Sequence, residues 1–252
     1  MPGIVKTRAI VTKTTRHGES DLVVSFLTEE HGLVKGYARG AVKSKKRFAG
    51  CFEPFTLLSV TLRFKASAGL AGIDSADILD AHYGIREDLD RINAGDVMLR
   101  FASMMEPGAG FAEPFLFMRD TLKVLERAKD PVALCAVFVV KFLLMGGYGI
   151  PHESCSRCGA GITGQPTVYI GGFALLCARC GSSMGGAKVS PGTLAFVRQA
   201  ETLEPAKMGR LVISTGTKDE LYVLLGGFAS SAAGKRLEYL EIFKPSVRKP
   251  LT

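Results

Sequence analysis

The sequence lacks the features that mark a membrane, disordered or secreted protein. It has no tryptophan, no low-complexity tract and no internal repeat. Hydrophobic residues make up 47% of its 252 residues and charged residues 22%, which is typical of a globular chain. The longest apolar stretch, residues 132–145, contains Lys141 and is shorter than the roughly 20 apolar residues that a membrane helix needs. Because the first residues run directly into a strand-like pattern, we expect no secretory signal and a cytoplasmic protein that does not bind membranes.

The chain also lacks a recognisable set of catalytic residues. Its four histidines are isolated from one another in the sequence, which is typical of surface or capping residues: His17, His31, His82 and His152. Neighbouring polar residues such as Glu19-Ser20-Asp21 and Glu29-Glu30 fit turn and cap chemistry. We find no clustered acids of the kind that a metal-dependent nuclease requires. The sequence therefore predicts a binding protein and not an enzyme.

Length and charge narrow the class of partner. A chain of this length is long enough to form two domains, each with its own core. The net charge of +8 and the isoelectric point near 9.2 favour a polyanionic partner. Net charge alone does not distinguish a nucleic-acid partner from an anionic membrane surface. The distribution of the charge along the chain is needed to distinguish them.

Residues 4–83 show the alternation that is typical of β-strands. The predicted strands cover residues 4–15, 22–27, 33–38, 55–65 and 70–79. Five strands with a long basic connection favour a small closed barrel of the oligonucleotide-binding (OB) kind, although the pattern leaves a sandwich open.

Beyond residue 84 the apolar period becomes helical. Helices are predicted at residues 86–105, 114–128 and 131–146, and the third is apolar on nearly every side, as a central helix would be. Ser190-Pro191 predicts the start of another helix, and a capping box at 217–220 predicts one more. We therefore expect an α+β protein with an OB-fold domain over residues 1–83 and a helical domain over residues 84–252.

Four cysteines interrupt the helical part in two matched pairs. Cys155-x-x-Cys158 and Cys177-x-x-Cys180 are separated by 18 residues, a spacing typical of a tetrahedral zinc site. A hairpin formed by residues 167–170 and 173–176 would bring the pairs together within a zinc-binding insertion at 153–182. Disulfides need an oxidising compartment and a redox dithiol needs only one pair, so both alternatives are weaker. We expect one structural Zn²⁺ per chain, with Cys51 and Cys135 as packing residues.

The positive charge is concentrated between His31 and Phe52, where no acidic residue occurs. Six basic residues in or beside this stretch are the predicted nucleic-acid contacts: Lys35, Arg39, Lys43, Lys45, Lys46 and Arg47. Lysine and arginine neutralise phosphates, and the interleaved Tyr37 and Phe48 offer faces on which unpaired bases could stack. A second basic patch near the C-terminus is either another contact or a solubilising tail: Lys235, Arg236, Lys244, Arg248 and Lys249.

Other classes of function remain open on these residues alone. A zinc-ribbon transcription or translation factor would bind specific sequences, a nuclease would turn over DNA with magnesium, and a protein-interaction adaptor would show no affinity for DNA.

Stretches spread over most of the chain carry a family resemblance. The run from Gly18 to Val24 with the following LTEEHGLVKGYARGAVKSKKRFAGCFEPF, together with LLMGGYGIP at 143–151 and the cysteine pairs, resembles the bacterial RecO family. The resemblance implies an OB-fold barrel followed by a helical domain with a zinc-binding insertion, and a nucleoid-associated location. It implies binding of single- and double-stranded DNA, strand annealing, and work with RecR to help RecA displace single-stranded DNA-binding protein. The family's basic barrel loop corresponds here to Arg39, Lys43, Lys45, Lys46 and Arg47.

Overall fold

The computed structural model describes residues 3–44, 46–64, 69–104, 112–169 and 171–237. Contacts between residues divide the chain into two compact units. The first comprises Met1–Asp88 with Met98–Glu126, and the second comprises Leu89–Val97 with Arg127–Thr252. The domain boundary that we expected after residue 83 stays a prediction.

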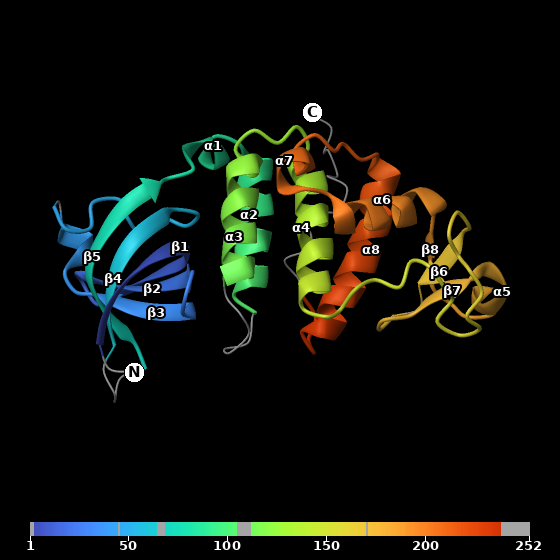
Figure 1. Ribbon diagram of the computed structural model, residues 1–252, viewed down its shortest axis with the longest axis horizontal. Helices are drawn as coiled ribbons and strands as arrows, with labels where there is room; N and C mark the ends of the chain where they lie inside the picture. The colour runs from blue at the N-terminus through green and yellow to red at the C-terminus, as the bar shows by residue number, and fades with distance from the viewer. Residues whose placement is uncertain (1–2, 45, 65–68, 105–111, 170, 238–252) are drawn as a thin grey trace, which may run out of the picture. The chain divides into compact units, whose positions relative to one another are not determined.

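Five strands of the first unit close into a barrel, as the alternation predicted (Figure 1). The strands are β1 (Gly3–His17), β2 (Asp21–Thr28), β3 (Gly32–Ala38), β4 (Leu57–Phe64) and β5 (Ala71–Asp80). Their order around the barrel is β1-β2-β3-β5-β4, and closure comes from a short parallel pairing of β3 with β5. The predicted OB-like barrel in an α+β chain is confirmed, and the sandwich alternative is excluded.

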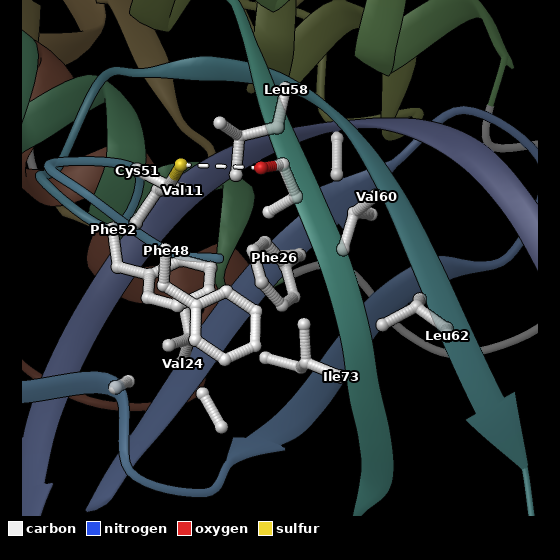
Figure 2. Close-up of a cluster of buried hydrophobic side chains, with 14 of the residues drawn as sticks. Val11, Val24, Phe26, Phe48, Cys51, Phe52, Leu58, Val60, Leu62 and Ile73 are labelled. Atoms are coloured by element: carbon white, nitrogen blue, oxygen red, sulfur yellow. Dashed lines mark hydrogen bonds between the residues drawn. The ribbon is translucent and has the colours of Figure 1, made fainter. Parts of the chain in front are cut away.

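The barrel is filled by side chains that point inward from alternate strand positions (Figure 2). Phe26 on β2 is fully buried, and Phe48 and Phe52 pack beside it from the connection between β3 and β4. A Cβ at Gly36 would lie 2.7 Å from the Ile73 side chain, so β3 needs glycine where it approaches β5. Cys51 is buried and its thiol donates to the carbonyl oxygen of Ala76 at 3.3 Å, which fits a packing residue.

Strand β1 carries a bulge that changes which side chains face outward. Val11 pairs with Phe26, but Lys13 and not residue 12 pairs with Ser25, so one residue is inserted into β1. A bulge of this kind reverses the alternation beyond it. Val11 is therefore buried in the core while Lys13 is exposed.

Short helical elements accompany the barrel in the same unit. The 3₁₀ helix η1 (Ala41–Lys43) follows β3, and α1 (Tyr83–Arg86) follows β5. Helix α2 (Leu89–Ala102) is shared between the two units, and α3 (Ala112–Leu125) belongs to the first.

The second unit is built around α4 (Pro131–Met145), whose side chains are buried on nearly every side as predicted. Asp130 caps this helix by accepting a hydrogen bond from the Ala133 amide at 3.0 Å. Helices α6 (Pro191–Thr202) and α8 (Thr215–Ala232) pack against it, and α7 (Pro205–Met208) joins them. A three-stranded sheet of β6 (Thr167–Tyr169), β7 (Leu175–Cys177) and β8 (Ala187–Val189) completes the unit with α5 (Ala178–Gly181).

One predicted helix start is wrong. The expected capping box at Thr217 lies inside α8, because Ser214 is the residue whose hydroxyl accepts from the Thr217 amide at 3.1 Å. Glu220, the expected partner in the box, instead accepts hydrogen bonds from the amide and the hydroxyl of Ser190 at 2.8 and 2.7 Å. It thus supports the start of α6, where Ser190 is the N-cap as predicted. No helix among the described residues combines the length and the apolar character that crossing a lipid bilayer requires.

Candidate metal centre and nucleic-acid interface

Two tight turns and a short hairpin bring the four predicted cysteines together. In the first turn the Cys155 amide donates to Ala160 and the Gly159 amide to Cys155, so the chain folds back on itself. Strands β6 and β7 form the predicted hairpin, which ends at Cys177, and α5 carries Cys180 one turn later. The Ser156 amide donates to the Leu175 carbonyl at 2.9 Å and ties the first turn to the hairpin.

The arrangement of the sulfurs fits a tetrahedral metal ion. The four Sγ atoms all lie within 4.8 Å of one another, and those of Cys158 and Cys177 are 3.9 Å apart. Zinc–sulfur bonds of about 2.3 Å in a tetrahedron place the sulfurs about 3.8 Å apart. All four thiols are free of disulfide bonds. The four cysteines are therefore placed to hold one metal ion.

Backbone groups prepare two of these thiols to ionise. Burial opposes ionisation of Cys155, but the amides of Cys177, Arg157 and Cys158 donate to its sulfur and together lower its pKa to about 6. The Ala160 amide likewise lowers the pKa of Cys158. Amides aimed at sulfur favour the thiolate, which is the form that binds metal. With four thiolates no position stays open for water or substrate, so such a site stabilises structure and does not catalyse.

Aromatic side chains connect the hairpin to α8 within the second unit. Tyr169 of β6 and Phe173 of the hairpin turn both pack on Phe228, with ring centroids 5.6 and 5.7 Å apart. Gly227 lies under Tyr169 so closely that a Cβ there would be 1.8 Å from the phenol oxygen. Folding of the hairpin is therefore coupled to the packing of α8.

The predicted nucleic-acid contacts lie on β3 and on the connection that follows it. Lys35 is on β3, Lys43 is in η1, and Arg39, Lys46 and Arg47 belong to the connection. All five of these side chains are exposed. Lys45 lies outside the described residues. We call the segment from Arg39 to Arg47 the basic loop.

Asp21 anchors the start of the basic loop. Its carboxylate accepts hydrogen bonds from the Tyr37 hydroxyl and from the Gly40 amide, the latter at 2.7 Å. The Tyr37 hydroxyl, the Gly40 amide and the nearby Arg39 charge all lower the pKa of this carboxyl. Further along, the Arg47 guanidinium donates to the Arg39 carbonyl at 2.6 Å and lies 4.4 Å from the centre of the Phe48 ring. These contacts hold both ends of the loop, although Arg39 and Arg47 are exposed.

The expectation that Phe48 offers a stacking face for bases is wrong. Phe48 is only 3% exposed, because its ring fills the barrel core beside Phe52. Tyr37, in contrast, is half-buried on the outer face, where its ring meets His17 edge to face at 5.6 Å. Of the two aromatics that we singled out, only Tyr37 is therefore in a position to meet a base.

One basic residue beside this surface was missed in the sequence. Lys13 pairs with Ser25 and Ser25 pairs with Lys35, so the three side chains form one row across β1, β2 and β3. Directly opposite residues share a face, and two strand spacings place Lys13 about 10 Å from Lys35. The alternation before the bulge assigns Lys13 to the interior face, so only knowledge of the bulge would have revealed it.

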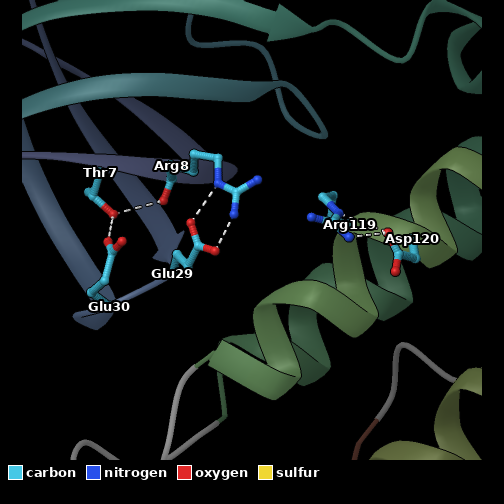
Figure 3. A network of polar contacts seen from close by, with 6 residues as sticks. All are labelled: Thr7, Arg8, Glu29, Glu30, Arg119 and Asp120. Atoms are coloured by element: carbon cyan, nitrogen blue, oxygen red, sulfur yellow. Dashed lines mark hydrogen bonds and ion pairs between the residues drawn. The ribbon is translucent and has the colours of Figure 1, made fainter.

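The acids that precede the basic loop are engaged elsewhere on the barrel (Figure 3). The Arg8 guanidinium donates to Glu29, with Nε 2.6 Å from a carboxylate oxygen, and the Thr7 hydroxyl donates to Glu30. Arg119 and Asp120 form a separate pair on α3. Glu29 therefore has its own counter-charge on β1.

Of the four histidines that were expected to be surface or capping residues, His82 is at the N-cap position of α1 but is buried, and His152 is partly buried. His82 is 1% exposed, and His152 is paired with Glu201 at 2.8 Å. In the C-terminal basic patch Lys235 and Arg236 are exposed, whereas Lys244, Arg248 and Lys249 lie outside the described residues.

Comparison with known proteins gives a consistent result over nearly the whole chain. Residues 1–82 match the family model described as recombination protein O, N terminal, and residues 86–241 match its C-terminal counterpart. A protein named DNA repair protein RecO from Syntrophus aciditrophicus (strain SB) is 30% identical over 94% of both chains. Proteins of the same name from Clostridium novyi (strain NT) and Anaeromyxobacter sp. (strain K) are 30% and 33% identical, over 95% and 70% of this chain and 93% and 70% of their own.

Proposed function

This chain belongs to the RecO family of DNA repair proteins, and on that premise we propose that its barrel binds DNA through the basic loop and promotes strand annealing. The ligands are single- and double-stranded DNA. The phosphate contacts are Lys35, Arg39, Lys43, Lys45, Lys46 and Arg47, joined by Lys13.

The observation that carries this proposal is the exposed basic surface of the barrel. Cations that point to solvent from an ordered backbone neutralise phosphates and release counterions when DNA binds. OB folds present the outer face of strands 2 and 3 to oligonucleotides. Lys35, Tyr37 and Ser25 lie on that face in this chain, and Lys13 extends it onto β1. A phosphate backbone running past the loop would leave Tyr37 as a stacking partner for an unpaired base.

Annealing follows from charge neutralisation without any hydrolysis. Two complementary strands repel each other through their phosphates, and a shared basic surface lowers that repulsion. We also propose that the protein acts with RecR and helps RecA onto DNA coated with single-stranded DNA-binding protein, and that the four-cysteine site holds Zn²⁺. Family membership supports the partners, and the four thiolates support zinc, because soft ligands in a tetrahedron suit that ion.

The test is annealing of complementary oligonucleotides coated with single-stranded DNA-binding protein. Replacing Lys43, Lys45, Lys46 and Arg47 with alanine should slow annealing by at least about tenfold, because several phosphate contacts are lost at once. A matched control removes the same charge elsewhere, at four exposed sites: Lys123, Lys188, Lys207 and Arg210. Annealing at the wild-type rate by the loop variant, or equal loss in the control, would overturn the proposal.

A further inference from the structure

The segment after β5 places a buried histidine between two carboxylates. Nδ1 of His82 lies 3.5 Å from Oδ1 of Asp80 and 3.5 Å from Oε2 of Glu126. Asp80 ends β5, and Glu126 comes directly after α3, so the three residues join distant parts of one compact unit. None of them belongs to the four-cysteine centre or to the basic loop.

The histidine lacks the partners that a buried ring needs. Its side chain is 2% exposed, and within the described part of the chain neither ring nitrogen has a hydrogen-bond partner. Buried polar atoms in proteins are nearly always paired, so an unpaired Nδ1 beside two carboxylates points to a cation as the shared partner. The backbone also holds His82 in place at a φ of 46°, where its amide donates to Oδ1 of Asp80 at 2.9 Å.

The spacing of the three ligand atoms suits a metal ion. Zinc bonds of about 2.0–2.2 Å to nitrogen and oxygen put neighbouring ligand atoms about 3.0–3.5 Å apart. The two nitrogen–oxygen distances of 3.5 Å lie at the upper end of that range, so the side chains would move little to bind an ion. All three atoms lie within 4.8 Å of one another. The carboxylate side chains are 41% and 23% exposed, which leaves a path for the ion and room for water ligands.

From this geometry we propose that Asp80, His82 and Glu126 bind one divalent transition-metal ion. An imidazole with two carboxylates suits Mn²⁺, Fe²⁺ or Zn²⁺, whereas Ca²⁺ and Mg²⁺ prefer sites made of oxygen alone. The Gly84 amide donates to the second oxygen of Glu126 at 3.3 Å and so orients the carboxylate. The nearby Arg86 guanidinium donates to the carbonyls of Ala81 and Pro54 and leaves the carboxylates to the ion. The bound ion links the end of β5 to the end of α3.

The experiment titrates Mn²⁺ into the full chain carrying its own metal, and follows free Mn²⁺ by electron paramagnetic resonance. Mn²⁺ prefers oxygen and nitrogen ligands and does not displace a softer ion from four thiolates. One saturable Mn²⁺ per chain is expected, with paramagnetic broadening of the His82 ring signals and not of the His17 signals. Asp80→Asn and Glu126→Gln should each weaken binding by about tenfold or more.

Asp74→Asn is the matched control, because Asp74 is a partly exposed carboxylate of the same barrel that pairs with Arg63 and lies outside the cluster. Its Mn²⁺ affinity should equal that of the wild type. Circular dichroism establishes that each variant is folded, and the amide variants preserve the acceptors for His82 and Gly84. The absence of a saturable site, equal affinity in Glu126→Gln and wild type, or broadening confined to the cysteine hairpin would each overturn the proposal.

Discussion

The basic loop and the four-cysteine hairpin differ in the direction in which their functional side chains point. In the hairpin, side chains converge: four sulfurs lie within 4.8 Å of one another, held by a turn, strands of only three residues and the short helix α5. In the loop, charged side chains diverge into solvent, while Asp21 and the buried Phe48 fix the backbone beneath them. Converging soft ligands stabilise a short segment, whereas exposed cations add little stability and remain available for a partner. The difference separates a region suited to holding the structure from the region that we propose contacts DNA.

Loss of the proposed metal site in the hairpin should have the largest effect. Comparable zinc peptides gain about 10–16 kcal/mol of apparent binding energy, and strands of three residues cannot replace it. Cys155→Ser should therefore abolish metal binding and leave the amides of β6 and β7 unprotected in hydrogen exchange, with β1 to β5 still protected.

Cys51→Ala is the control for that experiment, because Cys51 is a buried thiol of the barrel core that lies outside the metal centre. It should retain one metal ion per chain by elemental analysis. Protected hairpin amides in the metal-free Cys155→Ser variant would show that the two regions do not differ as described.

Overpacking of the contact between hairpin and α8 should have the next largest effect. Alanine usually stabilises a helix relative to glycine by about 1 kcal/mol. At Gly227 the added Cβ would clash with Tyr169, so Gly227→Ala should lower the free energy of unfolding by about 1–3 kcal/mol. Gly216→Ala, in the same helix with nothing within 4 Å of its Cβ, should be neutral or stabilising in urea denaturation. Equal stability of the two variants would refute the tight contact.

Regions governed by local spacing were the ones that the sequence predicted well. The five strands, the central helix at α4, the Ser190 cap and the cysteine hairpin all lie within a few residues of their predicted positions. Each depends on neighbours along the chain, through alternation, helical period or ligand spacing. The metal centre belongs to this group, because its two pairs are close in sequence.

Features governed by distant contacts were missed. Glu220 has the spacing of a capping box, yet it bonds Ser190, thirty residues away. Phe48 directly follows the basic loop but packs on Phe52 in the core, where Phe52 meets Phe26, and the β1 bulge moves Lys13 to the outer face. His82 gains its carboxylate neighbour Glu126 only through the tertiary fold. No pattern along the chain encodes these partners.

Loss of the loop anchor should have the smallest effect. Asp21→Ala removes the acceptor for Tyr37 and Gly40, so amide exchange at Gly40 should quicken while the melting temperature changes little. In the wild type the Tyr37 hydroxyl, then the Gly40 amide, lowers the pKa of Asp21 below its ordinary value of 3.8. The anchor is therefore complete above pH 3.8 and is lost as the pH falls through the folded-state pKa. A Gly40 amide shift that titrates at or above pH 3.8 would contradict this.

The salt dependence of single-stranded DNA affinity tests the division between the two regions most directly. Each phosphate contact contributes about 0.7 to the slope of log K against log salt concentration. Replacing Lys43, Lys45, Lys46 and Arg47 with alanine should flatten that slope by about 3, while Cys155→Ser, which disturbs the hairpin and its contact with α8 but not the barrel, leaves it unchanged. A loop variant with the wild-type slope, or a hairpin variant with a flattened one, would contradict the assignment of DNA binding to the barrel.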